Sequence, residues 1–124
     1  MTKEMNERNL FRFLEWPVYN DAQETFNEIM AIVKALPSEI KYTLGNQLIR
    51  SALSIVLNIA EGSGRGTDNE LNHYFNITIG SLNETVAALD ILLRNKYLSN
   101  EKFDELLKQL ESISRQLGGF KKTL

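Results

Sequence analysis

Apolar residues recur every three or four positions along most of the chain, which is the pattern of amphipathic helices. Four such stretches predict helices over about 17–36, 39–61, 68–96 and 100–117. The second stretch is apolar most of the way round, a property of helices that are buried on more than one side. The third alternates spacings of three and four, close to a coiled-coil seam. No β-type alternation of useful length interrupts them.

Short connections separate these stretches, and short connections place consecutive helices side by side in opposite directions. The sequence therefore predicts an all-α fold, an antiparallel up-down-up-down four-helix bundle over residues 16–120. A polar leader over 1–15 precedes it and ends in a small apolar cluster. Pro17 suits the first turn of a helix, where its missing N–H costs nothing, and Pro37 stops that helix. The apolar cluster consists of Leu10, Phe11, Phe13, Leu14 and Trp16.

Capping residues mark the later helix ends. Thr67 and Glu70 form a T-x-x-E capping box before the third helix, and Ser99 or Asn100 caps the fourth. Gly118 and Gly119 stand where a left-handed C-cap would end the fourth helix.

Composition narrows the functional classes. The chain has 124 residues, 43% of them apolar, which is ordinary for one folded domain. Fourteen basic and sixteen acidic residues give a net charge of −2, so the basic excess typical of nucleic-acid binders is absent from the total. The chain has no cysteine, and we find neither a secretory signal nor a membrane span. We expect a cytoplasmic protein.

Two blocks in the middle of the chain resemble the motifs of the bacterial four-helix-bundle proteins named after 23S rRNA intervening sequences. The family's second motif is similar to Phe75, Ile79, Gly80-Ser81-Leu82 and Glu84, and Leu36-Pro37 resembles the end of the family's first helix. The first block contains Gln47, Leu48, Arg50, Ala52, Ser54, Ile55, Asn58, Ile59, Ala60, Glu61, Gly62 and Arg65.

The resemblance implies an antiparallel four-helix bundle that assembles as a ring-shaped homopentamer. The accessory protein of diversity-generating retroelements looks like a relative that binds nucleic acid and a reverse transcriptase. Many other members have no known role. Independently of the family, the apolar surface of the second helix exceeds what a lone bundle needs, which indicates an oligomer.

Five polar residues lie in or beside this apolar surface: Arg50, Asn58, Glu61, Arg65 and Glu84. The structural interpretation is that Glu61 pairs with Arg65, that Asn58 satisfies backbone groups near the glycine turn, and that Arg50 meets Glu84. The functional interpretation is a small recognition site.

Catalytic and metal-binding patterns are weak. Glu70 and His73 form one E-x-x-H, but a di-iron bundle needs two, and the chain has one histidine. Gly62–Gly66 lacks the lysine and spacing of a phosphate loop, although it precedes a helix N-terminus, a generic anion site. No serine has a histidine and carboxylate in a recognisable pattern. We therefore expect no enzyme, no metal and no cofactor.

Two functional hypotheses remain open for this non-enzymatic oligomer. One is an accessory protein that binds RNA or DNA, and the other is a scaffold that binds a polypeptide partner without any nucleic-acid role. No membrane is expected as a partner. The candidate nucleic-acid contacts are Lys34, Lys41, Arg115, Lys121 and Lys122.

Overall fold

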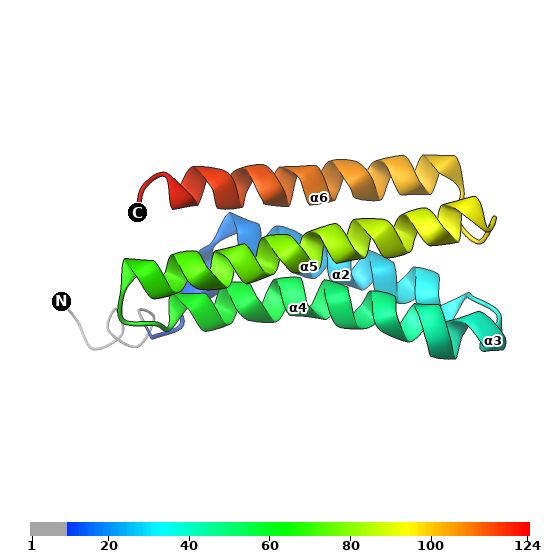
Figure 1. The fold of residues 1–124 in the computed structure, drawn as a ribbon, viewed down its shortest axis with the longest axis horizontal. Coiled ribbons are helices and arrows are strands. Elements are labelled where there is room, and N and C mark those ends of the chain that lie inside the picture. The colour runs from blue at the N-terminus through cyan, green and yellow to red at the C-terminus, as the bar shows by residue number, and fades with distance from the viewer. Residues whose placement is uncertain (1–9) are drawn as a thin grey trace.

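Four long helices run antiparallel along a common axis in the structure, a computed structural model that describes residues 10–124 (Figure 1). They are α2 (Pro17–Lys34), α4 (Asn46–Ser63), α5 (Asp68–Arg94) and α6 (Asn100–Lys121). Helix α4 packs against α2 and α5, and α6 packs against α5 and α2, so the bundle closes on itself. No strand occurs in the described part of the chain. The predicted all-α, up-down-up-down bundle is confirmed.

Several helix ends follow the predicted local chemistry. Pro17 is the first residue of α2. The Thr67 side chain accepts a hydrogen bond from the Glu70 backbone N–H at the start of α5. Ser99 caps α6 in the same way, through the backbone N–H of Lys102. Each cap satisfies one of the N–H groups that a helix start leaves without an intrahelical partner.

The second helix begins differently from the predicted 39–61 segment. A short helical turn, α3 (Ser38–Ile40), leads into a π-helical turn, η2 (Lys41–Gly45), before the regular α4 starts. Gly45 is buried there, and a Cβ atom on it would lie 2.9 Å from Cγ1 of Val33. Any larger residue at this position would require Val33 or the turn to shift, so glycine lets this wide turn pack directly on α2.

The fourth helix extends beyond the predicted 117 and ends at Lys121. The expected left-handed cap at Gly118–Gly119 was wrong, because no glycine in residues 10–124 has a positive φ. The last turn is held instead by Phe120, whose ring packs against Trp16 and Phe75 with centroid distances of 4.8 and 5.0 Å. Burying this aromatic side chain favours continuing the helix over ending it.

The left-handed cap is found at the end of α5, on a residue that is not glycine. Lys96 has a φ of 66°. The Tyr97 N–H donates to the Leu92 carbonyl and the Lys96 N–H donates to the Leu93 carbonyl, which is the Schellman arrangement. A lysine at this position adopts a conformation that glycine reaches without steric cost.

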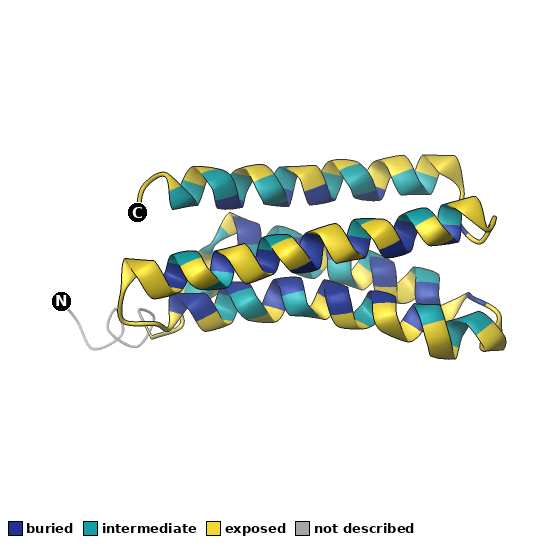
Figure 2. Ribbon diagram, in the orientation of Figure 1, coloured by how far each residue is buried: buried dark blue, intermediate teal, exposed yellow. Residues whose placement is uncertain are grey.

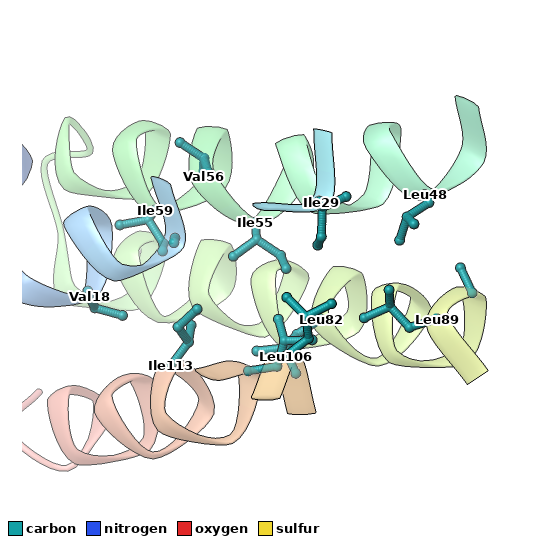
Figure 3. Close-up of a cluster of buried hydrophobic side chains, with 14 of the residues drawn as sticks. Val18, Ile29, Leu48, Ile55, Val56, Ile59, Leu82, Leu89, Leu106 and Ile113 are labelled. Atoms are coloured by element: carbon teal, nitrogen blue, oxygen red, sulfur yellow. The ribbon is translucent and has the colours of Figure 1, made fainter. Parts of the chain in front are cut away.

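Aliphatic side chains from all four long helices fill the interior (Figure 3). Figure 3 shows Ile29 of α2, Leu48 and Ile59 of α4 and Leu106 of α6 projecting into the space between the helices. All four side chains are fully buried. The predicted apolar stripes thus meet in one continuous core.

The predicted leader is described only in part, because residues 1–9 lie outside the described residues. Its end forms a short 3-10 helix, η1 (Arg12–Glu15). Trp16 and Phe13 are half-buried, and the Phe13 ring lies 4.9 Å from that of Tyr19. Leu10, Phe11 and Leu14 remain exposed.

Candidate interaction face

The contact between α4 and α5 is built from small polar side chains. The buried Thr85 hydroxyl lies 2.9 Å from Ser51 Oγ and 2.8 Å from the Ser81 carbonyl oxygen, so both acceptors are within reach of its single proton. One turn away, the Ser54 and Ser81 hydroxyls are 2.7 Å apart. Hydroxyl-bearing side chains this short allow two helix backbones to approach closely while every buried polar atom keeps a partner.

A close approach at the 64–67 turn depends on Gly62. A Cβ atom on Gly62 would lie 2.9 Å from the Tyr74 Cβ and 3.1 Å from Cδ1 of Leu71. Gly62 is the only glycine of the 62–66 segment with such contacts, since Gly64 has one ordinary contact and Gly66 has none within 4 Å. The segment thus serves packing, at one of its three glycines.

The outer side of the α4–α5 pair carries apolar side chains in water, and we call it the outer α4–α5 face. Leu53 and Leu57 of α4 are 37% and 55% exposed, and Ile77 and Ile91 of α5 are 38% and 46% exposed. In Figure 2 the exposed positions alternate with buried ones along both helices. A hollow lined in part by Leu10, Phe11 and Leu57 continues this face at the end of α4.

Arg50 and Glu84 both lie exposed among these apolar residues. Glu84 Oε1 accepts a hydrogen bond of 2.9 Å from Gln47 Nε2. The expected ion pair between Arg50 and Glu84 is not formed among residues 10–124, where Arg50 has neither a salt bridge nor a side-chain hydrogen bond. The shorter amide of Gln47, which projects from the α4–α5 contact, occupies the carboxylate instead.

The remaining polar residues divide between helix and turn. Asn58 Nδ2 donates to the Ser54 carbonyl and hydroxyl one turn earlier on α4, so it does not serve the glycine turn as expected. Arg65 follows the predicted spacing, with its Nη2 at 2.5 Å from Glu61 Oε1 and 2.6 Å from the Tyr74 hydroxyl. Its guanidinium also lies over the Tyr74 ring, 4.8 Å from the centroid.

This arrangement makes the turn a poor anion site. The pKa of Arg65 is raised, chiefly by Tyr74 and also by Glu61, because both favour the charged guanidinium, and desolvation only partly opposes them. The positive charge is already paired with the Glu61 carboxylate. Asp68 and Glu70 occupy the first turn of α5, so the helix N-terminus already faces negative charge.

The five predicted nucleic-acid contacts do not converge. Lys34 and Lys41 lie at one end of the bundle, in the last turn of α2 and in η2. Lys121 and Lys122 lie at the opposite end, where α6 finishes, and Lys121 Nζ is hydrogen-bonded to Asn76 Oδ1. Arg115 is exposed on α6 between the two ends. A single subunit therefore presents no continuous basic surface built from these residues.

Residues 10–124 contain neither a metal-binding cluster nor a membrane-spanning helix. No group of three or more acidic or histidine side chains is close enough to hold a metal ion in that range. Every helix there is too short or too polar to cross a lipid bilayer.

The geometry defines a class of protein, an antiparallel four-helix bundle with an exposed apolar face on one helix pair. The chain belongs to the 23S rRNA-intervening sequence protein family, whose sequence pattern matches residues 15–119. A solved structure of a protein of unknown function from the S23 ribosomal protein family of Bacteroides thetaiotaomicron has the same fold. It is 24% identical, with a TM-score of 0.78, and the match covers 85% of this chain and 98% of that one. No functionally curated protein matches the chain in sequence.

Sequence reasoning missed the role of the hydroxyl residues between α4 and α5. It considered the serines only as nucleophiles, although Ser51, Ser54 and Asn58 recur at helical spacing, as do Thr78, Ser81 and Thr85. Two such stripes of small polar residues on consecutive helices are the signal that would have predicted a close helix–helix contact.

Proposed function

We propose that this protein is a non-enzymatic, self-associating helical scaffold whose subunits meet through the outer α4–α5 face. The observation that carries the proposal is the exposure of Leu53, Leu57, Ile77 and Ile91 on adjacent helices. Exposed apolar residues that gather on one face mark interaction sites. Each square ångström of apolar surface removed from water contributes about 25 cal/mol of hydrophobic stabilisation. The charged residues on this face are few, which suits an interface core.

The contacts of the polar side chains support a structural role over a catalytic one. The hydroxyls of Ser51, Ser81 and Thr85 are engaged between α4 and α5. His73 is exposed, and its ring packs edge-on against Tyr74 at 5.6 Å. Neither set brings a nucleophile and a base together in a pocket, which is the arrangement that nucleophilic catalysis needs.

Nucleic-acid binding is the second candidate function, and the assembly is what would make it feasible. Lys121 and Lys122 lie at the end of α6, whereas Arg12 lies at the end of α4, where its Nε donates to the Ser63 carbonyl at 3.3 Å. Repeating these residues around an oligomer would gather basic side chains that one subunit keeps apart. The acidic residues near the 64–67 turn oppose this role, so we place it after the scaffold.

Light scattering on a sizing column, with the ratio of absorbance at 260 and 280 nm recorded, tests both candidates. We expect an integer multiple of the chain mass of 14.2 kDa without co-eluting nucleic acid. Five copies is the number that the family resemblance implies. A monomer would contradict the proposal, and nucleic acid that is lost at high salt would favour the second candidate.

A matched pair of variants locates the contact. Leu57→Glu places a charge in the outer α4–α5 face and should dissociate the assembly. Met30→Glu does the same at a residue of α2 that is 42% exposed and lies on another side of the bundle, and it should leave the assembly intact. Equal effects of the two substitutions would show that the interface lies elsewhere.

A further inference from the structure

No contact among residues 10–124 requires glycine at position 80. It lies inside α5, where glycine costs about 1 kcal/mol relative to alanine. It is exposed, and a Cβ atom on it would meet nothing within 4 Å among residues 10–124 apart from its chain neighbours and the adjacent backbone of α5. Gly118 and Gly119 are similarly free, but they lie in the last turns of α6, where a helix frays at little cost. Glycine in the middle of an exposed helix allows a second backbone to approach closely.

Gly80 adjoins the charged pair of the outer α4–α5 face. Glu84 follows it by one helical turn, and Ser81 contacts Ser54 across the two helices. Arg50 precedes Ser54 by one turn. Because α4 and α5 are antiparallel, Arg50 and Glu84 lie at the same level of the bundle, beside Gly80 and between the exposed aliphatic residues.

Each member of this pair has unused hydrogen-bonding capacity. Arg50 has no salt bridge or side-chain hydrogen bond among residues 10–124, and Glu84 uses only Oε1, in its bond to Gln47. A guanidinium offers five N–H donors and a carboxylate accepts at both oxygens, so the two are well matched to each other.

The charges indicate which partner fits. Arg50 and Glu84 place a cation on α4 and an anion on α5 within the outer α4–α5 face, so a second copy of the chain offers each of them the opposite charge. Nucleic acid fits poorly, because the Glu84 carboxylate would repel phosphate. We propose that a second copy of this chain packs across Gly80, and that Arg50 of one subunit pairs with Glu84 of its neighbour. The inference rests on the proposed self-association and adds its specific contacts.

Charge reversal tests the pair, with light scattering as the readout. Arg50→Glu alone and Glu84→Arg alone each place like charges opposite one another, and each should weaken assembly by about tenfold or more. Mixed together, the two variants recover opposite charges across the contact. A tagged Arg50→Glu protein should therefore retain untagged Glu84→Arg protein on a column, while neither variant retains its own kind.

The control reverses two exposed charges on α6, Lys108→Glu and Glu111→Lys, and should leave the mass of the assembly unchanged. All substituted side chains are exposed, so circular dichroism should show the same helical content in every variant. Gly80→Leu gives an independent readout. It should dissociate the assembly while the melting temperature of the released bundle stays the same or rises, because glycine is unfavourable inside a helix and a Cβ atom at this position meets nothing within 4 Å among residues 10–124.

The outcomes separate the two proposals. A wild-type monomer would overturn self-association and the pair together. A wild-type oligomer that persists in both reversed variants would overturn the pair and leave the scaffold standing. Reversed variants that dissociate but do not combine would also overturn it, since a contact between subunits requires the mixture to reassemble.

Discussion

The polar contacts between α4 and α5 are made by small side chains, whereas each polar contact between α2 and α6 includes at least one long side chain. Ser51, Ser54, Ser81 and Thr85 hold the first pair of helices at close range. The second pair is linked by three separate polar contacts, each 2.7–2.8 Å long: Thr25 with Gln109, Asp21 with Gln116, and Glu28 with Lys102.

These two helix–helix contacts, which we call seams, should differ in how well they tolerate a larger side chain. A seam of serines leaves no room for a longer side chain, because interiors are packed as densely as organic crystals. The seam between α2 and α6 can rearrange more easily, because each of its contacts includes a long, half-buried side chain from α6 (Lys102, Gln109 or Gln116) that has several rotamers. Substitutions of the same kind should therefore be costly in the first seam and mild in the second.

The largest effect is expected from Ser51→Leu. Ser51 is 3% exposed and touches Thr85, so a leucine would force the two helices apart and remove a hydrogen bond. We expect a loss of about 3 kcal/mol in the free energy of unfolding, measured by urea denaturation. Ser112→Leu is the control, since Ser112 is only half-buried between α2 and α6, and should change stability by about 0.5 kcal/mol or less. Equal losses would refute the contrast between the seams.

Gly62→Ala tests the same seam at its tightest point and should cost about 2 kcal/mol, because the new methyl group would overlap Tyr74 and Leu71. Gly66→Ala is matched to it in chemistry and lies four residues away in open space. That control should be neutral or slightly stabilising, because alanine restricts the unfolded chain. The melting temperatures of the two variants distinguish a packing role of the glycine from a role in turn flexibility. A smaller loss of stability in Gly62→Ala than in Gly66→Ala would exclude the packing role of Gly62.

Lys96→Gly tests the connection that leads from the tight pair into α6. Lys96 adopts a left-handed conformation at the end of α5, which costs a side-chain-bearing residue about 1 kcal/mol. Replacing it should raise the free energy of unfolding by about that amount, less the added entropy of the unfolded chain. Asn95→Gly is the control and should destabilise, since Asn95 has a negative φ of −92°. A less stable Lys96→Gly protein would show that the lysine makes a compensating contact.

The smallest effect is expected at the polar seam, where Glu28 and Lys102 form an ion pair of 2.8 Å with about a third of each side chain exposed. Lys102 lowers the pKa of Glu28, mainly through their hydrogen bond, and Glu28 raises the pKa of Lys102. A lowered carboxyl pKa contributes stability above the unfolded value of 4.5, which is lost as the pH falls through the folded value. A raised lysine pKa contributes stability below the unfolded value of 10.5, and that stability is lost as the pH rises through the folded value.

Glu28→Gln should therefore cost about 0.5 kcal/mol at neutral pH, a small effect because solvent screens the pair. The deficit relative to the wild type should shrink as the pH falls below 4.5. Urea midpoints at a series of pH values check this, with Glu24→Gln, exposed on the same helix, as the control. A deficit that stays constant through this range would mean that the glutamate acts through its shape rather than its charge.

Much of the fold could be predicted from local signals. The 3.6-residue period located all four long helices, Pro17 began the first, and Thr67 and Ser99 capped two others. These features depend on residues within one turn of each other, so the order of amino acids is sufficient to reveal them. The π-helical turn before Asn46 and the continuation of α6 past Gly118 were missed, because Val33 and Phe75 impose them from distant parts of the chain.

The sequence predicted which residues belong to the candidate site, but it did not predict which of their side chains make contact. Arg50 and Glu84 were expected to meet, yet Gln47 takes the carboxylate. Helical periodicity tells which residues share a face, so the sequence by itself determined the helices, their caps and the bundle. Only the tertiary structure decided which polar atoms pair and which apolar residues stay in water, because these depend on the distance between helices, and that distance follows from side-chain sizes on both sides of each seam.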